Sequence, residues 1–123
     1  MIKQSAISKL SNRLYLEACA QVGKKQALRI QEPVIERDYV LAWLLTEMTA
    51  HPVLSDALAF KGGTALRRVY FDEYRFSEDL DFTLTRELNL EQLFVAFKDV
   101  PFGTYVTTRF TSTTKARFLL QVK

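Results

Sequence analysis

Apolar residues recur at helical spacing through the first half of the chain. Ile7, Leu10 and Leu14 fall three or four residues apart, which predicts a helix over residues 5–20. A wider apolar stripe predicts a second helix over residues 32–52, and Pro52 should end it because proline lacks a backbone N–H. The stripe consists of Val40, Leu41, Leu44, Leu45 and Met48.

The pattern changes to short apolar runs and strict alternation in the second half. Residues 57–60 predict a strand that ends in a tight turn at Lys61-Gly62-Gly63. Residues 64–71 then predict a helix with Thr64 near its N-cap. Further elements follow: a strand at 79–84, a helix at 88–100, and a hairpin formed by 104–112 and 115–123.

Together these elements predict an α+β fold, a mixed sheet with helices packed on it. The 123 residues suit a single domain, with a helical part at 1–56 and an α/β core at 57–123. The last predicted strand reaches Lys123 without a turn or cap, so we expect a chain truncated at its C-terminus. We also expect that strand to expose an edge through which the protein self-associates.

Composition narrows the class of protein. Hydrophobic residues make up 48% of the chain and charged residues 25%, which favours a packed core over disorder. No apolar run approaches the length of a membrane span, and the N-terminus lacks the apolar region of a signal peptide. A single cysteine, Cys19, cannot form an internal disulfide, so we expect a reducing, cytoplasmic location.

Charge is distributed unevenly along the chain. Residues 1–30 contain six Lys or Arg and one Glu, residues 31–60 contain five acids and one Arg, and residues 83–123 are basic again. A basic end can attract a polyanion such as RNA or a nucleotide. Because the net charge is only +3, an ordinary solvated surface is the favoured interpretation of any single basic patch.

The Gly-Gly turn has two interpretations. Glycines between a strand and a helix allow the backbone to approach a ligand, and the first N–H groups of the helix can bind an anion. Lys61 and the Thr64 hydroxyl can add to such a site. An ordinary turn would have the same sequence, and neither common phosphate-binding glycine motif is present.

Asp79 and Asp81 also have two interpretations. Alternate residues of a strand project to the same side, so the two carboxylates would repel each other unless a cation lies between them. Mg²⁺ prefers such oxygen ligands and keeps waters and phosphate oxygens as its others. The alternative is a solvent-facing acidic strand paired with Arg67, Arg68 or Arg75.

The combination of the two motifs is more informative than either alone. A strand, Gly-Gly-Thr, a helix and a strand with Asp-x-Asp would put a triphosphate cradle beside a metal site. Phosphoryl or nucleotidyl transfer needs this layout, because positioning and charge neutralisation do most of the catalytic work.

"FKGGTAL" followed by "RFSEDLDF" closely resembles the AbiEii/AbiGii toxin-type nucleotidyltransferases of the DNA polymerase β-like superfamily, and "IERDYVLAWLL" resembles the helix before their Gly-Gly. The resemblance covers about residues 33–84 and implies that the mixed sheet and its flanking helices form a fold of the nucleotidyltransferase type. It implies a toxin of a bacterial toxin–antitoxin or abortive infection system, controlled by a separate antitoxin. It also implies transfer of a nucleoside monophosphate from an NTP to an acceptor hydroxyl. Some relatives add nucleotides to tRNA ends, so RNA is the expected acceptor.

The resemblance also implies roles for individual residues. Gly62, Gly63 and Thr64 would bind the triphosphate, while Asp79 and Asp81 would bind Mg²⁺, two ions in a complete protein. Lys61, Arg75 and Ser77 also match family positions that contribute to the nucleotide site.

The chain departs from the superfamily at the third carboxylate, which is expected on a later strand. After Asp81 the acids are Glu87, Glu91 and Asp99, and none falls on a predicted late strand. We therefore expect an incomplete catalytic site. The alternative to an active enzyme is a remnant of the fold that binds a nucleotide or an antitoxin.

Overall fold

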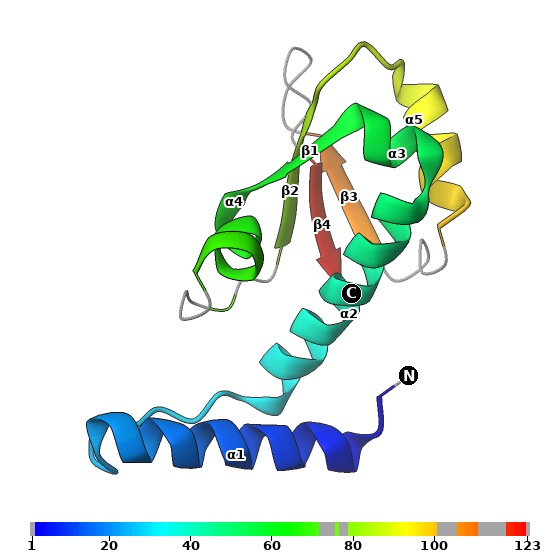
Figure 1. The fold of residues 1–123 in the computed structure, drawn as a ribbon. Coiled ribbons are helices and arrows are strands. Elements are labelled where there is room, and N and C mark those ends of the chain that lie inside the picture. The colour runs from blue at the N-terminus through cyan, green and yellow to red at the C-terminus, as the bar shows by residue number, and fades with distance from the viewer. Residues whose placement is uncertain (1, 72–75, 77–78, 101–105, 111–117, 123) are drawn as a thin grey trace. The chain divides into compact units, whose positions relative to one another are not determined.

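The computed structural model describes residues 2–71, 76, 79–100, 106–110 and 118–122, with the backbone alone for Leu90 and for the last two strands. The fold is α+β, as predicted (Figure 1). Its elements are α1 (Gln4–Val22), α2 (Glu32–Ala50), α3 (Pro52–Ala57), β1 (Leu58–Lys61), α4 (Gly62–Ala65), η1 (Leu66–Tyr70), β2 (Asp79–Leu84), α5 (Leu90–Lys98), β3 (Val106–Phe110) and β4 (Phe118–Val122).

Two compact units make up the chain, Met1–Tyr39 and Val40–Lys123, and α2 contributes to both. In the first unit, α1 confirms the predicted N-terminal helix and ends at Gly23, which has a φ of +81°. Ile7 and Ser11 are buried on one side of α1. The Ser11 hydroxyl donates a 2.8 Å hydrogen bond to the carbonyl of Ile30, which holds the segment before α2 against α1.

A small polar cluster lies on α1 around Tyr15. The Arg29 guanidinium lies 4.8 Å from the centre of the Tyr15 ring and donates a 2.5 Å hydrogen bond to Asn12. A hydrogen bond with Cys19, one turn further along α1, raises the pKa of Tyr15 above its ordinary value, and the electrostatic interaction with the same side chain adds to this effect. The cluster thus links α1 to the segment that follows it.

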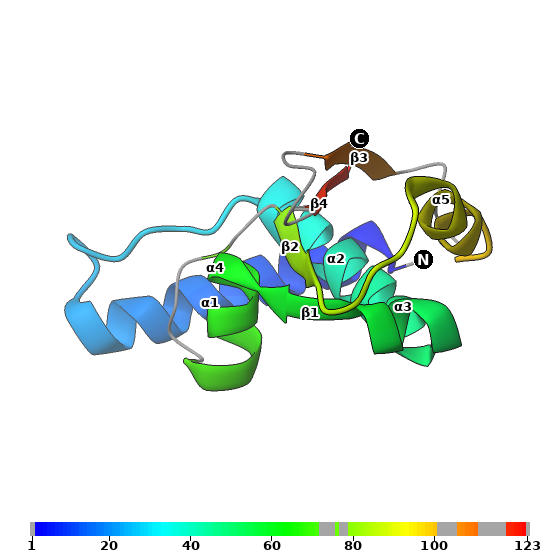
Figure 2. The same cartoon turned by 90° about the horizontal axis from the view of Figure 1, so that it is seen from above.

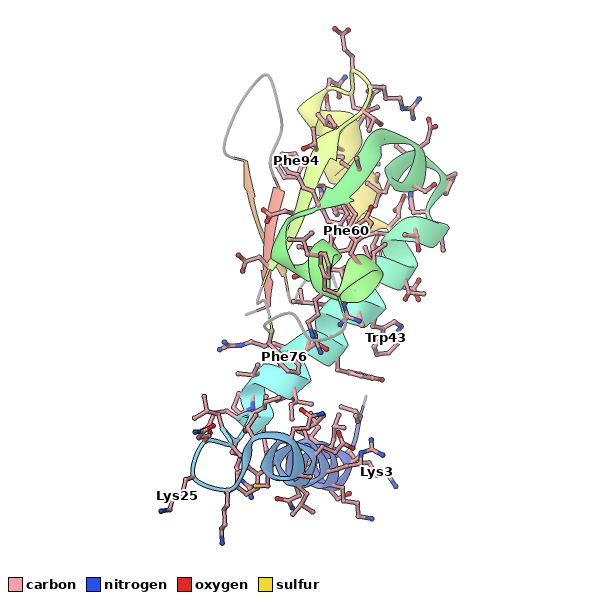
Figure 3. The ribbon with its side chains drawn as sticks, turned by 60° about the vertical axis from the view of Figure 1, so that its left-hand side comes forward. Lys3, Lys25, Trp43, Phe60, Phe76 and Phe94 are labelled. Atoms are coloured by element: carbon pink, nitrogen blue, oxygen red, sulfur yellow. The ribbon has the colours of Figure 1, made fainter. Side chains whose placement is uncertain are left out.

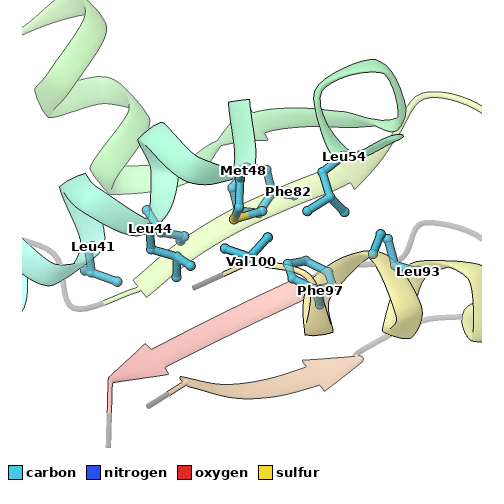
Figure 4. Close-up of a cluster of buried hydrophobic side chains, with 10 residues drawn as sticks. Leu41, Leu44, Met48, Leu54, Phe82, Leu93, Phe97 and Val100 are labelled. Carbon is cyan, nitrogen blue, oxygen red and sulfur yellow. The ribbon is translucent and has the colours of Figure 1, made fainter. Parts of the chain in front are cut away.

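The hydrophobic core of the second unit forms between the sheet and α2, α3 and α5. The predicted stripe on α2 is confirmed at its centre, where Leu41, Leu44 and Met48 are buried. Figure 4 shows Met48 beside Phe82 of β2, and these two residues form one buried cluster with Leu41, Leu44 and Phe97 of α5. Pro52 ends α2 as predicted, but it also begins α3, which the sequence pattern did not predict; proline suits a first helical position because no N–H is needed there.

The sheet has the order β1-β2-β4-β3, and all three pairings are antiparallel. The predicted hairpin is confirmed as β3 and β4. The expectation that the last strand exposes an edge is wrong, because β4 pairs with β2 on one side and β3 on the other. Within the described part of the chain the outer strands are β1 and β3, so β4 offers no open edge for self-association.

Candidate functional site

The residues of β2 alternate between a buried face and a half-buried face, as the alternating sequence predicts. Leu80 and Phe82 are buried and belong to the hydrophobic core. Asp79 and Asp81 are half-buried and alternate with them, so they project from the opposite face of the strand. Burial of the two apolar side chains therefore fixes the direction of both carboxylates.

The Gly-Gly turn joins β1 to a helical segment beside β2. Strand β1 runs from α3 to α4 (Figure 2), and Gly62 begins α4 with a φ of +79°. The helix starts at the turn, as predicted: Lys61 is the N-cap residue, and Thr64 lies in the first turn as the third residue of α4. The chain turns immediately at the end of β1, because glycine tolerates positive φ without steric cost.

Gly62 lies in direct contact with the side chain of Asp81. A Cβ atom added to Gly62 would stand 3.0 Å from both the Cβ and the Cγ of Asp81, and closer still to its Oδ2. Cβ atoms essentially never approach other atoms so closely, so the Asp81 carboxylate occupies the space that any other residue would fill. The two motifs predicted to cooperate are thus in contact.

Thr64 links the same turn to the other aspartate. Its hydroxyl donates a 2.5 Å hydrogen bond to the backbone carbonyl of Asp79, and the residue is only 2% exposed. The hydroxyl proton is therefore engaged inside the protein. Sequence reasoning missed this contact, because it depends on how α4 packs against β2 and no local pattern encodes that packing.

Basic residues lie on β1 and on the helical segment that follows the Gly-Gly turn. Register places Lys61 directly opposite Asp81 on the neighbouring strand, at a distance where opposite charges attract. Arg67 and Arg68 follow on η1, and the Arg67 guanidinium lies 3.7 Å from the centre of the Phe76 ring. The predicted site residues Arg75 and Ser77 lie outside the described residues.

The predicted helix over residues 64–71 is only partly confirmed, because its second half is a π-helix. The Phe71 N–H donates a 2.7 Å hydrogen bond to the carbonyl of Leu66, five residues earlier. Single turns of this kind are rare and often occur at functional sites. This wider turn directly follows the Gly-Gly-Thr segment, so it belongs to the same candidate site.

These features define the class of the protein. It is an α+β protein with paired carboxylates on a central strand, held against a glycine turn that starts a short helix. Comparison with known protein families matches residues 43–119 to the family described as nucleotidyl transferase AbiEii toxin, type IV TA system. The chain belongs to this AbiEii family of nucleotidyltransferase toxins, which confirms the resemblance inferred from its motifs and implies an antitoxin partner.

The other comparisons add no further relative. Searches of curated proteins and of solved structures gave no match. None of the helices that the structure describes has both the length and the apolar composition needed to cross a membrane.

Proposed function

We propose that this chain is a Mg²⁺-dependent nucleotidyltransferase that transfers a nucleoside monophosphate from an NTP to a hydroxyl group of an RNA acceptor such as tRNA. The observation that carries the proposal is the contact between Gly62 and Asp81 in a chain of the AbiEii family. It places a glycine turn suited to phosphate beside a carboxylate suited to a metal ion. We also propose that the protein acts in the cytoplasm.

The residues present fit a magnesium site. Asp79 and Asp81 offer hard oxygen ligands from one face of β2, and Gly62 keeps a side chain out of the space that the Asp81 carboxylate occupies. No group of three or more His, Cys, Asp or Glu side chains gathers among the described residues. Two carboxylates are nevertheless enough, because Mg²⁺ usually keeps waters and takes substrate phosphates as its remaining ligands. When bound, the metal would neutralise the triphosphate and the departing pyrophosphate, and two ions would serve the attacking and leaving oxygens.

Other residues of the chain would bind the nucleotide and position the aspartates. Gly62 and Gly63 let the backbone approach the triphosphate, and Lys61 adds a positive charge opposite Asp81. Thr64 positions Asp79 through its carbonyl. We assign Arg75 and Ser77 to the nucleotide as well, because they match family positions in the sequence.

The proposed reaction is a displacement at the α-phosphorus. The acceptor oxygen forms a bond to the α-phosphorus while the bond to the α–β bridging oxygen breaks. Pyrophosphate leaves, and the proton of the acceptor hydroxyl passes to solvent. Alignment of the two substrates supplies much of the rate in such a reaction.

A second candidate function is supported by the strand beside the aspartates. Register places Gln121 opposite Asp79 and Leu119 opposite Asp81, and the sequence of β4 contains no acidic residue. A site with two carboxylates can bind a nucleotide without providing a base. On this alternative the protein is a catalytically incomplete member of the fold that binds a nucleotide or its antitoxin.

Calorimetric titration with each NTP, with and without Mg²⁺, tests the nucleotide site. The wild type should bind in a Mg²⁺-dependent manner, and Asp79→Asn/Asp81→Asn should abolish that dependence. Glu87→Gln/Glu91→Gln is the matched control, because it removes the same charge from two exposed acids off the site. The proposal would be contradicted if both variants lost NTP affinity equally, or if the wild type bound NTP with the same affinity with and without Mg²⁺.

Transfer of a radiolabelled nucleotide to total RNA distinguishes the two candidate functions. Labelled RNA that depends on Asp79 and Asp81 supports the transferase. Mg²⁺-dependent nucleotide binding without any transfer supports the incomplete binding protein.

A further inference from the structure

The first compact unit carries the net charge of the whole chain. Residues 1–39 contain seven basic and four acidic side chains, a net charge of +3, whereas residues 40–123 contain ten of each. This unit also lies outside residues 43–119, which match the AbiEii family. The nucleotidyltransferase assignment therefore leaves the basic unit without a role.

Four cations of this unit are exposed and lack an ion-pair partner within the described part of the chain. Lys9 and Arg13 lie one turn apart on α1, and Lys24 and Lys25 lie in the turn that follows it. Glu17 is the one acidic residue in the sequence before Glu32. Figure 3 shows Lys25 extending away from the ribbon.

Lys9 and Arg13 lie on the side of α1 that faces away from its buried residues. Ile7 and Ser11 are two residues before each of them, which on a helix places them on roughly opposite sides. Together with Ala6 and Leu10, the two cations line a shallow hollow on the helix surface. This face of α1 therefore has two adjacent positive charges beside the apolar side chains of Ala6 and Leu10.

We propose that this basic surface, Lys9, Arg13, Lys24 and Lys25, binds the phosphodiester backbone of a polynucleotide. Uncompensated cations spread over a helix and a turn suit an extended polyanion, whose counterions are released on binding. An anionic membrane fits less well, because interfacial helices bury an apolar face in lipid and α1 buries Ile7 within its own unit. Contacts to phosphates alone predict binding with little dependence on base sequence.

The inference goes beyond the proposed function, because it needs neither the nucleotide nor the aspartates. If the acceptor is RNA, the basic surface binds its backbone and so raises the affinity of the protein for its substrate. Asp79→Asn/Asp81→Asn should then bind the polynucleotide as well as the wild type does. This variant separates failure of the inference from failure of the proposed function.

Fluorescence anisotropy with a labelled single-stranded RNA of about 20 nucleotides measures the binding between 50 and 200 mM salt. Each phosphate contact contributes roughly 0.7 to the slope of log K against log salt for a single strand, so Lys9→Gln/Arg13→Gln should lower the slope by about 1.4. We expect the same variant to weaken binding roughly tenfold at 100 mM salt. Lys24→Gln/Lys25→Gln should weaken it in the same way.

The matched control is Arg86→Gln/Lys98→Gln, which lowers the net charge equally but changes two exposed residues of the second unit. It should change the affinity by less than about twofold, since only local phosphate contacts alter the slope. Equal weakening by the control would overturn the proposal. So would competition by polyglutamate as strong as by RNA, or tighter binding to phosphatidylserine vesicles. A single-stranded DNA of the same sequence identifies which polynucleotide is preferred.

Discussion

Gly62 and the carboxylate of Asp81 occupy adjoining space, and a single added carbon at position 62 would overlap the acid. The turn and the strand are 19 positions apart in the sequence, yet each limits what the other can be. A glycine is therefore required at position 62 for two reasons, its positive φ and its contact with the aspartate. Alanine substitutions at Gly62 and at Gly23 separate these two reasons.

Gly62→Ala should damage both stability and ligand binding, whereas Gly23→Ala should affect stability alone. Both glycines have positive φ, but a Cβ at Gly23 would meet nothing within 4 Å. Backbone strain should cost about 1–3 kcal/mol at either site, and the overlap with Asp81 should add about 1–3 kcal/mol at Gly62. Urea unfolding and Mg–NTP calorimetry measure the two effects. Equal unfolding free energies for the two variants would show that Asp81 moves aside freely.

Thr64→Val should destabilise the protein by about 1–3 kcal/mol, because it leaves the Asp79 carbonyl without its buried donor. Thr85→Val is the matched control: the Thr85 hydroxyl also donates to a carbonyl, that of Asp56, but at an exposed position where water can replace it. We expect the control to cost less than about 0.5 kcal/mol. Thr64→Ser keeps the hydroxyl and should restore most of the loss in denaturant unfolding. A serine variant as unstable as the valine variant would assign the effect to packing instead.

Gln121→Glu should strengthen divalent cation binding. Register sets position 121 opposite Asp79, and opposite positions of an antiparallel pair bring their Cβ atoms to about 5 Å. A third carboxylate adds an oxygen ligand and raises repulsion in the metal-free protein, so we expect roughly tenfold tighter Mg²⁺ binding. Gln21→Glu, at an exposed position of α1, is the control for charge alone. Unchanged affinity, measured by calorimetry, would place the ion away from β4.

Tyr15 should titrate above the ordinary range of a tyrosine, and Cys19→Ala should lower its pKa because the thiol causes most of the rise. The folded protein holds the phenol proton more tightly than the unfolded chain does. The associated stability is therefore present below about pH 10 and is lost as the pH rises through the folded pKa. NMR titration of labelled tyrosine measures the change. A Tyr15 pKa that does not respond to Cys19→Ala would contradict this origin.

Local patterns in the sequence predicted most of the elements that position the site. Alternation through residues 79–84 predicted both the strand and its faces. Because Leu80 and Phe82 are buried in the core, the alternating aspartates must project from the opposite face. The stripe on α2 predicted its buried side for the same reason. The paired motifs also predicted the family, which the match to residues 43–119 confirms.

What the sequence did not predict depends on contacts between distant segments. An α-helix was predicted for the residues that form η1. The two helix types differ only in whether each backbone N–H bonds to the carbonyl four or five residues earlier, so the sequence pattern does not distinguish them. The role of the Thr64 hydroxyl depends on how α4 meets β2. The place of β4 inside the sheet also could not be inferred, since its sequence suits an outer strand equally well.

The position of β4 has a consequence for how the protein is made. Leu80 pairs with Leu120, so the strand that carries the aspartates lacks its second neighbour until residues far along the chain have been synthesised. Pairings between such distant residues form slowly, whereas the β3–β4 hairpin is local. A nascent chain that already contains both motifs therefore still has an open sheet edge beside them. Translation itself thus delays the moment at which a member of a toxin family completes its sheet.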